Sequence, residues 1–191
     1  NGYGETDGKD EFARNWITYS IPRTLQNIGD TYAELGQYDK AMEKFQHALP
    51  FFIKLGREDE IASNLNSTGW VFFARGQYAK AIENYQQALA IAKRLGTEDR
   101  IAIYLSNIGL VYYFQQQYDP AIKYLVESIE LKEKLRKTAT GNARRDYLAS
   151  QIVSYRFLIS SYLQNQEAAN AFKVMEHSRS RLLAERLADS E

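Results

Sequence analysis

Two histidines, His47 and His177, are the side chains of this sequence that ordinarily change charge near neutral pH, so they are the first candidates for catalysis or metal binding. Neither lies in a pattern that builds such a site, such as His-Glu-x-x-His or paired Glu-x-x-His motifs. The sequence has no cysteine, which excludes thiolate metal sites and a cysteine nucleophile within these residues. We therefore predict a non-enzymatic protein with no metal site and no cofactor.

Carboxylates and basic residues are common, but their spacing is that of hydrated helix faces. Several acids recur at helical intervals, among them Asp30, Glu34, Glu43 and Glu83. The glycines stand alone at turns and helix contacts, so the repeated copies contain no glycine-rich phosphate loop. A basic segment over residues 136–147 is interpreted as solvated charge at a helix end, with a phosphate site as the alternative.

Composition argues against two further classes of function. The 191 residues include 24 lysines and arginines and 24 aspartates and glutamates, so the chain has no net field to attract nucleic acid or an anionic membrane. No apolar run approaches the roughly 20 residues that span a bilayer. The lack of cysteine leaves the compartment open, and we expect the cytoplasm. The chain begins at Asn1 without a signal peptide, which we interpret as an excised fragment.

The chain contains three similar copies of one segment, which begin at Leu25, Leu65 and Leu105, so that each copy starts 40 residues after the one before. A period of this length is typical of stacked arrays, in which each unit buries its apolar face against its neighbours. This organisation, rather than any catalytic group, is the main feature of the sequence.

Each copy has the pattern of a helical hairpin. A glycine is followed three positions later by an aromatic residue, as at Gly29 and Tyr32. A break follows, and then an alanine with a large residue four positions later, as at Ala41 and Phe45. Glycine inside a helix costs roughly 1 kcal/mol relative to alanine, so its recurrence predicts close approach of the second helix.

This set of residues resembles the tetratricopeptide repeat. The glycine, tyrosine and alanine positions of that family are met at Gly29, Tyr32, Gly36, Tyr38, Ala41 and Ala48, and again at Gly69, Phe72, Gly76, Tyr78, Ala81 and Ala88. The chain departs from the family at Leu25, Leu65 and Leu105, where tryptophan is usual, and its length resembles the 40-residue variety of kinesin light chain. The resemblance implies an all-α fold, a right-handed α-solenoid of antiparallel helical hairpins.

The resemblance also implies the domain organisation. We expect a flexible N-terminal segment with at most a short helix over residues 1–19, and a repeat domain over residues 20–191 whose first helix is capped by Ser20. The hairpins are predicted at about 20–56, 57–96, 97–137 and 142–188. About ten residues are inserted before the fourth hairpin, which we interpret as a lengthened helix pair.

The last helix has a second resemblance. Residues 171–183 are similar to the closing helix that precedes the caspase-like peptidase domain in bacterial proteins that join such repeats to a CHAT domain. The resemblance implies a regulatory module of a larger peptidase. The alternative is a terminal helix whose arginines keep the array soluble.

In the tetratricopeptide family the first helices line a concave groove, and the resemblance implies that a peptide or partner segment binds there. The predicted binding residues are Arg23, Asn27, Asp30, Asn66, Trp70, Phe73, Asn107, Leu110, Tyr113, Phe114 and Arg156. The aromatic residues among them are expected to anchor apolar side chains, and the asparagines to hold a peptide backbone. The alternatives are that the fold itself, the N-terminal segment or a second copy in a homo-oligomer covers these rings.

Overall fold

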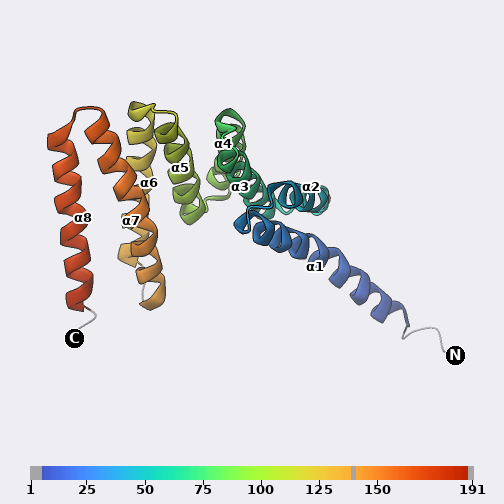
Figure 1. The fold of residues 1–191 in the computed structure, drawn as a ribbon. Coiled ribbons are helices and arrows are strands. Elements are labelled where there is room, and N and C mark those ends of the chain that lie inside the picture. The colour runs from blue at the N-terminus through green and yellow to red at the C-terminus, as the bar shows by residue number, and fades with distance from the viewer. Residues whose placement is uncertain (1–5, 139–140, 189–191) are drawn as a thin grey trace. The chain divides into compact units, whose positions relative to one another are not determined.

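The computed structural model describes the backbone over residues 6–138 and 141–188, and the side chains over residues 20–138 and 151–180. Within these residues the chain is helical, without strands (Figure 1). The helices are α1 (Thr6–Glu34), α2 (Tyr38–Lys54), α3 (Glu58–Ala74), α4 (Tyr78–Leu95), α5 (Glu98–Phe114), α6 (Tyr118–Thr138), α7 (Gly141–Gln164) and α8 (Ala168–Ala188). The chain forms two compact units, residues 1–91 and residues 92–191, which are described separately.

The first helix differs from the prediction. We expected it to begin at Ser20 with at most a short helix before it, but α1 begins at Thr6 and runs through Pro22 without a break. Proline inside a helix removes one backbone hydrogen bond, which is why the sequence favoured a helix start there. The ring of Pro22 is fully buried in the packed part of the unit, and this burial offsets the lost bond.

Each hairpin turns at a residue with left-handed backbone conformation. Gly36 has a φ of 70°, and its N–H donates to Ala33 O at 3.0 Å while the N–H of Gln37 donates to Tyr32 O at 2.8 Å. These two bonds satisfy carbonyls that the end of α1 would leave unpaired. In the third hairpin a glutamine, Gln116, takes the equivalent position with a φ of 60°.

The recurring glycines lie where the two helices of a hairpin touch. A Cβ atom built on Gly29 would lie 2.5 Å from the Phe45 ring, and one built on Gly109 would lie 2.8 Å from Cγ of Leu125. Real side chains do not approach so closely. The close helix approach predicted from the repeated glycine is therefore confirmed.

Unit 1 has a core of small and aromatic residues between its hairpins. Phe45 of α2 and Val71 of α3 are buried together with Ala33 and Ala41. Tyr32 packs against this cluster with part of its ring exposed, as do two residues of α2. The alanines allow the helices to approach closely enough for one ring to fill the space between them.

Unit 2 contains α5 to α8, in which each helix packs against the next (Figure 1). Its core includes Leu125 and Ile129 from α6 and Tyr155 and Leu158 from α7. α6 and α7 have 21 and 24 residues, while α5 has 17. The described part of the segment inserted before the fourth hairpin thus belongs to these longer helices.

Candidate functional site

A buried polar network joins the first two hairpins in unit 1. Asn64 of α3 is almost fully buried, and its Nδ2 donates to Oε1 of Gln26 at 2.6 Å and to the carbonyl of Phe45 at 3.1 Å. Nε2 of Gln26 donates in turn to Ser67 Oγ at 3.1 Å and to the Asp30 carboxylate at 3.3 Å. Because buried amides must keep their hydrogen bonds, this network fixes how α1 and α3 sit against each other.

The network lies beside a pocket of about 480 Å³ between α1 and α3. We call it the acidic pocket; its lining residues are Asp30, Ala33, Glu34, Asn66, Ser67 and Trp70. The Trp70 side chain is 39% exposed, and its ring meets the Tyr38 ring edge-on at a centroid distance of 6.0 Å. Burial raises the pKa of Asp30, and hydrogen bonds from Ser67 and Gln26 oppose that rise.

The structure brings three of the predicted residues of unit 1, Asp30, Asn66 and Trp70, into the acidic pocket. Arg23 and Asn27 are exposed on α1 and do not line it. Phe73 also lies outside the pocket, because its ring packs on Tyr78 at the hairpin turn with a centroid distance of 5.9 Å.

Three of the predicted residues of unit 2 belong to an aromatic cluster on α5, α6 and α7, which we call the aromatic patch: Tyr113, Phe114, Tyr118, Arg156 and Phe157. The Tyr113 ring contacts Phe157 edge-on at 5.0 Å and Phe114 at 5.6 Å. Phe114 remains 46% exposed. The guanidinium of Arg156 lies 5.0 Å from the centre of the Phe157 ring, so the rim of the patch is cationic.

Tyr113 has a second role within this patch. It is half-buried, and it links α5 to α7 through Phe157. The ring therefore contributes to packing of the third and fourth hairpins as well as to the surface, which is one of the alternatives raised by the sequence. Asn107 and Leu110 are also half-buried on α5. Phe114 is the most exposed of the predicted residues on this helix.

A second polar network occurs at the equivalent junction in unit 2. The hydroxyls of Ser106 on α5 and Ser154 on α7 are 2.9 Å apart, and Nζ of the buried Lys132 donates to Ser154 Oγ at 3.1 Å. Burial lowers the pKa of Lys132 to about 8. Ser154 is only 1% exposed, so this serine and lysine pair, although close enough for proton transfer, connects helices rather than facing a substrate.

The neighbouring turn of α6 carries a buried ion pair. Nη2 of Arg136 donates to Oε2 of Glu133 at 3.2 Å, and the hydroxyl of Tyr155 lies 3.5 Å from the other carboxylate oxygen. With its amide oriented to suit both neighbours, Gln151 donates to Oε1 of Glu133 at 3.1 Å and accepts from its backbone N–H at 3.2 Å. A buried carboxylate is tolerated only when its oxygens are bonded in this way.

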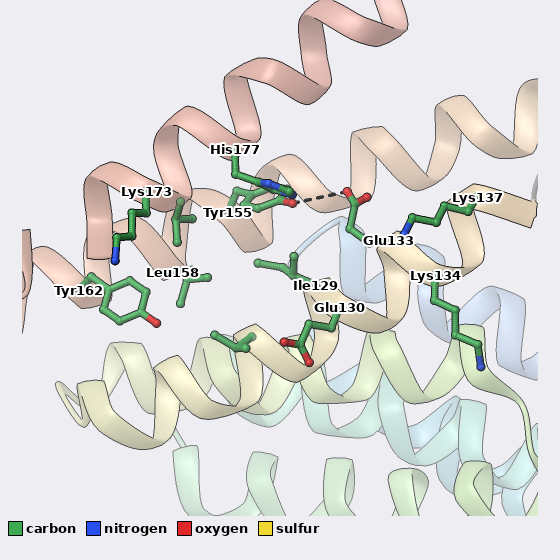
Figure 2. Close-up of a pocket in the computed structure, with 12 residues that line it drawn as sticks. Ile129, Glu130, Glu133, Lys134, Lys137, Tyr155, Leu158, Tyr162, Lys173 and His177 are labelled. Atoms are coloured by element: carbon green, nitrogen blue, oxygen red, sulfur yellow. Dashed lines mark hydrogen bonds between the residues drawn. The ribbon is translucent and has the colours of Figure 1, made fainter. Parts of the chain in front are cut away.

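A further pocket, of about 570 Å³, lies in unit 2 between α6, α7 and α8 (Figure 2). We call it the lysine-flanked pocket; it is lined by Val126, Ile129, Glu130, Glu133, Lys134, Lys137, Tyr155, Leu158, Tyr162, Lys173, Val174 and His177. This pocket was not predicted from the sequence, because the binding residues were expected on the first helices and His177 lies in no recognised site motif. The signal available in the sequence was the set of apolar residues on these helices next to the spaced lysines of α6 and α8.

Neither a metal-binding cluster nor a membrane-spanning helix is found among the described residues. No group of three or more histidine, aspartate or glutamate side chains among them is arranged to hold a metal ion. In the same part of the chain, no helix is both long and apolar enough to cross a membrane.

Comparison with known proteins identifies the family. A tetratricopeptide repeat model matches residues 60–134, and another matches residues 22–49, so that together they cover just over half of the chain. The chain therefore belongs to the tetratricopeptide repeat family, as its glycine, tyrosine and alanine positions predicted. A comparison with curated protein sequences gave no match.

Solved structures share the fold. The crystal structure of BtubC (BKLC) from P. vanneervenii has a TM-score of 0.75 and 20% identity, over 86% of this chain and 64% of that one. Aspartyl phosphate phosphatase F from Bacillus subtilis has a TM-score of 0.74 and 19% identity, over 88% and 41% of the two chains. The TPR-like repeats of a putative kinesin light chain from Podosopora anserina have a TM-score of 0.51 and 16% identity, over 83% of this chain and 92% of that one.

These likenesses confirm the predicted fold class, an all-α solenoid of antiparallel helical hairpins. At these identities they show the fold alone. The chain spans less than two thirds of the length of the first two structures.

Proposed function

We propose that this chain is a non-catalytic protein-interaction module and that a partner segment binds to the surface of its first helices. The observation that carries the proposal is the exposure of Phe114 within the aromatic patch. An aromatic ring that is 46% exposed, and that is held by a second ring, presents a rigid apolar surface to a partner. Rings of this kind often dominate the affinity of protein interfaces because they lose little rotamer entropy on binding.

The acidic pocket of unit 1 suits a basic side chain of a partner. Two carboxylates, Asp30 and Glu34, lie beside the exposed face of Trp70, and the amide of Asn66 lies at the same pocket. An ammonium or guanidinium group is attracted both by carboxylates and by the face of an indole ring. We infer that a partner segment that binds unit 1 carries a lysine or arginine for this pocket, and that one that binds unit 2 carries an apolar side chain for the aromatic patch.

Membership of the tetratricopeptide family supports a protein partner over other ligand classes, since a repeat array offers an extended surface for another chain. Nucleic acid and membranes are not among the proposed partners, and a homo-oligomer remains a prediction that light scattering tests. The role of regulatory module for a caspase-like peptidase also remains a prediction. The sequence of the natural protein after Glu191 tests it, because that role requires a His and Cys pair there.

The experiment is affinity capture of the partner, followed by calorimetric titration of the captured segment as a synthetic peptide. Phe114→Ala is expected to weaken binding by about 2 kcal/mol. Phe172→Ala is the matched control, because Phe172 is an equally large ring on α8 that is 59% exposed and lies outside the patch. Equal affinity of the two folded variants for the peptide would refute binding at the aromatic patch.

A further inference from the structure

The lysine-flanked pocket uses different helices from the proposed partner site. Its walls are the second helices of the last two hairpins, α6 and α8, and α7 contributes Tyr155, Leu158 and Tyr162 between them. Side chains from all three helices point into the space (Figure 2). A pocket of about 570 Å³ is in the range of known small-molecule sites.

The floor of the pocket is apolar. Ile129 from α6, Leu158 from α7 and Val174 from α8 meet in it. From Val126 to Lys137, the first and last lining residues of α6, the helix rises about 16 Å, which is comparable with the extended length of dodecanoate. A floor of this kind gains from contact with an apolar chain rather than with a hydrated ion.

The charges around the floor are not evenly distributed. On α6 the lining carboxylates Glu130 and Glu133 balance the lining ammonium groups Lys134 and Lys137. Lys134 is also paired with Glu98 at 2.5 Å. Among the described residues of α7 and α8, Lys173 and His177 line the pocket and no carboxylate does, so Lys173 gives this side of the pocket a positive charge.

Lys173 lies at the same end of the pocket as Tyr162 (Figure 2). Among the residues that the structure describes, Lys173 forms no ion pair. An ammonium group and a phenol beside an apolar floor are two donors that suit a single carboxylate.

We propose that the lysine-flanked pocket binds a linear fatty carboxylate of medium chain length. The tail lies along Ile129, Leu158 and Val174, and the carboxylate lies beside the ammonium group of Lys173 and the hydroxyl of Tyr162. This site is independent of the surface proposed for a protein partner.

The test is calorimetric titration of the whole chain with dodecanoate below its micelle concentration, near neutral pH. We expect saturable binding of one dodecanoate per chain. Lys173→Glu is expected to weaken it by about tenfold or more, because the variant places a like charge beside the carboxylate. Lys123→Glu is the matched control, since Lys123 is an exposed lysine of α6 that does not line the pocket.

Two further measurements test the apolar contact and the charge contact separately. Val174→Trp fills the floor and is expected to abolish binding, while dodecylammonium is expected not to bind the unaltered chain. Circular dichroism melting accompanies each variant, and Lys173→Glu decides the charge contact even if Val174→Trp does not fold. The proposal is overturned if dodecanoate does not saturate, if the two lysine variants bind it equally, or if dodecylammonium binds as tightly. It is also overturned if Phe114→Ala weakens binding as much as Lys173→Glu, because dodecanoate would then occupy the aromatic patch.

Discussion

Gly69 of α3 lies directly against the ring of Tyr85 on α4, and a Cβ atom added to the glycine would lie 2.8 Å from that ring and 3.3 Å from the carbonyl of Ala81. We predict that Gly69→Ala destabilises the chain by about 1 to 2 kcal/mol, because overpacking exceeds the helix propensity gained. Urea denaturation measures the change. Adding Gly69→Ala to a Tyr85→Val background should be neutral or stabilising, and a loss of similar size in both backgrounds would contradict the steric explanation.

Gln116 holds a left-handed turn position at which glycine stands in the first two hairpins. We predict that Gln116→Gly stabilises the chain by about 0.5 to 1 kcal/mol, since a side chain at this φ costs more than the backbone entropy that glycine adds to the unfolded state. Thermal and urea unfolding report the gain. Gln117→Gly, one residue later and without a left-handed φ, should give no gain, so equal effects would refute the argument.

Lys132 predicts a pH dependence of stability. Burial lowers the pKa of this lysine to about 8, whereas an unfolded lysine has a pKa of about 10.4. Between these values the folded chain binds fewer protons than the unfolded chain, so the free energy of unfolding rises with pH from about 8 to 10. Lys132→Met should lack that rise, while the exposed Lys123→Met should retain it. Parallel pH profiles for all three chains would contradict the prediction.

The buried carboxyl of Asp30 predicts that the free energy of unfolding falls with rising pH in the acid range, the opposite of the effect of Lys132. Burial raises its pKa, so the folded chain holds this proton to a higher pH than the unfolded chain, and stability falls as the pH rises through that window. Asp30→Asn cannot titrate. We therefore expect the free energy of unfolding of the variant, minus that of the unaltered chain, to increase from acid to neutral pH. Urea titrations at each pH measure this difference. Glu83→Gln, at an exposed carboxylate of α4 that does not contribute to the pKa shift of Asp30, controls for the loss of one negative charge.

The hairpins could be predicted from the sequence because their signals are local and repeated. The break at Gly36 predicted a turn, and the recurring glycine at position 29 predicted a close helix contact, which the structure shows against Phe45. The start of α1 was predicted at Ser20 because proline is tolerated in the first turn of a helix but is unfavourable inside it. Burial of the Pro22 ring, which compensates for that cost, depends on tertiary packing.

The candidate sites were predicted less completely. Trp70 and Asp30 were predicted as binding residues because the family pattern places them on first helices. The structure places both in the lining of the acidic pocket, and their role in binding stays a prediction. Phe73 was assigned to the same surface, but its ring packs on Tyr78. The lysine-flanked pocket depends on side chains from three helices, and that combination has no signature along the chain.

The hydrogen bond from Asn64 to Gln26 helps similar hairpins to stack in the correct order. Hairpins that resemble one another can stack in the wrong order during folding. An out-of-order neighbour would bury Asn64 without its amide partner, at a cost of about 1 to 3 kcal/mol. Phe45 or Val71 would pack against many alternative surfaces, because apolar contact is non-directional. The buried hydrogen bond between Asn64 and Gln26 thus makes the packing specific, because it favours the correct neighbouring hairpin over similar ones.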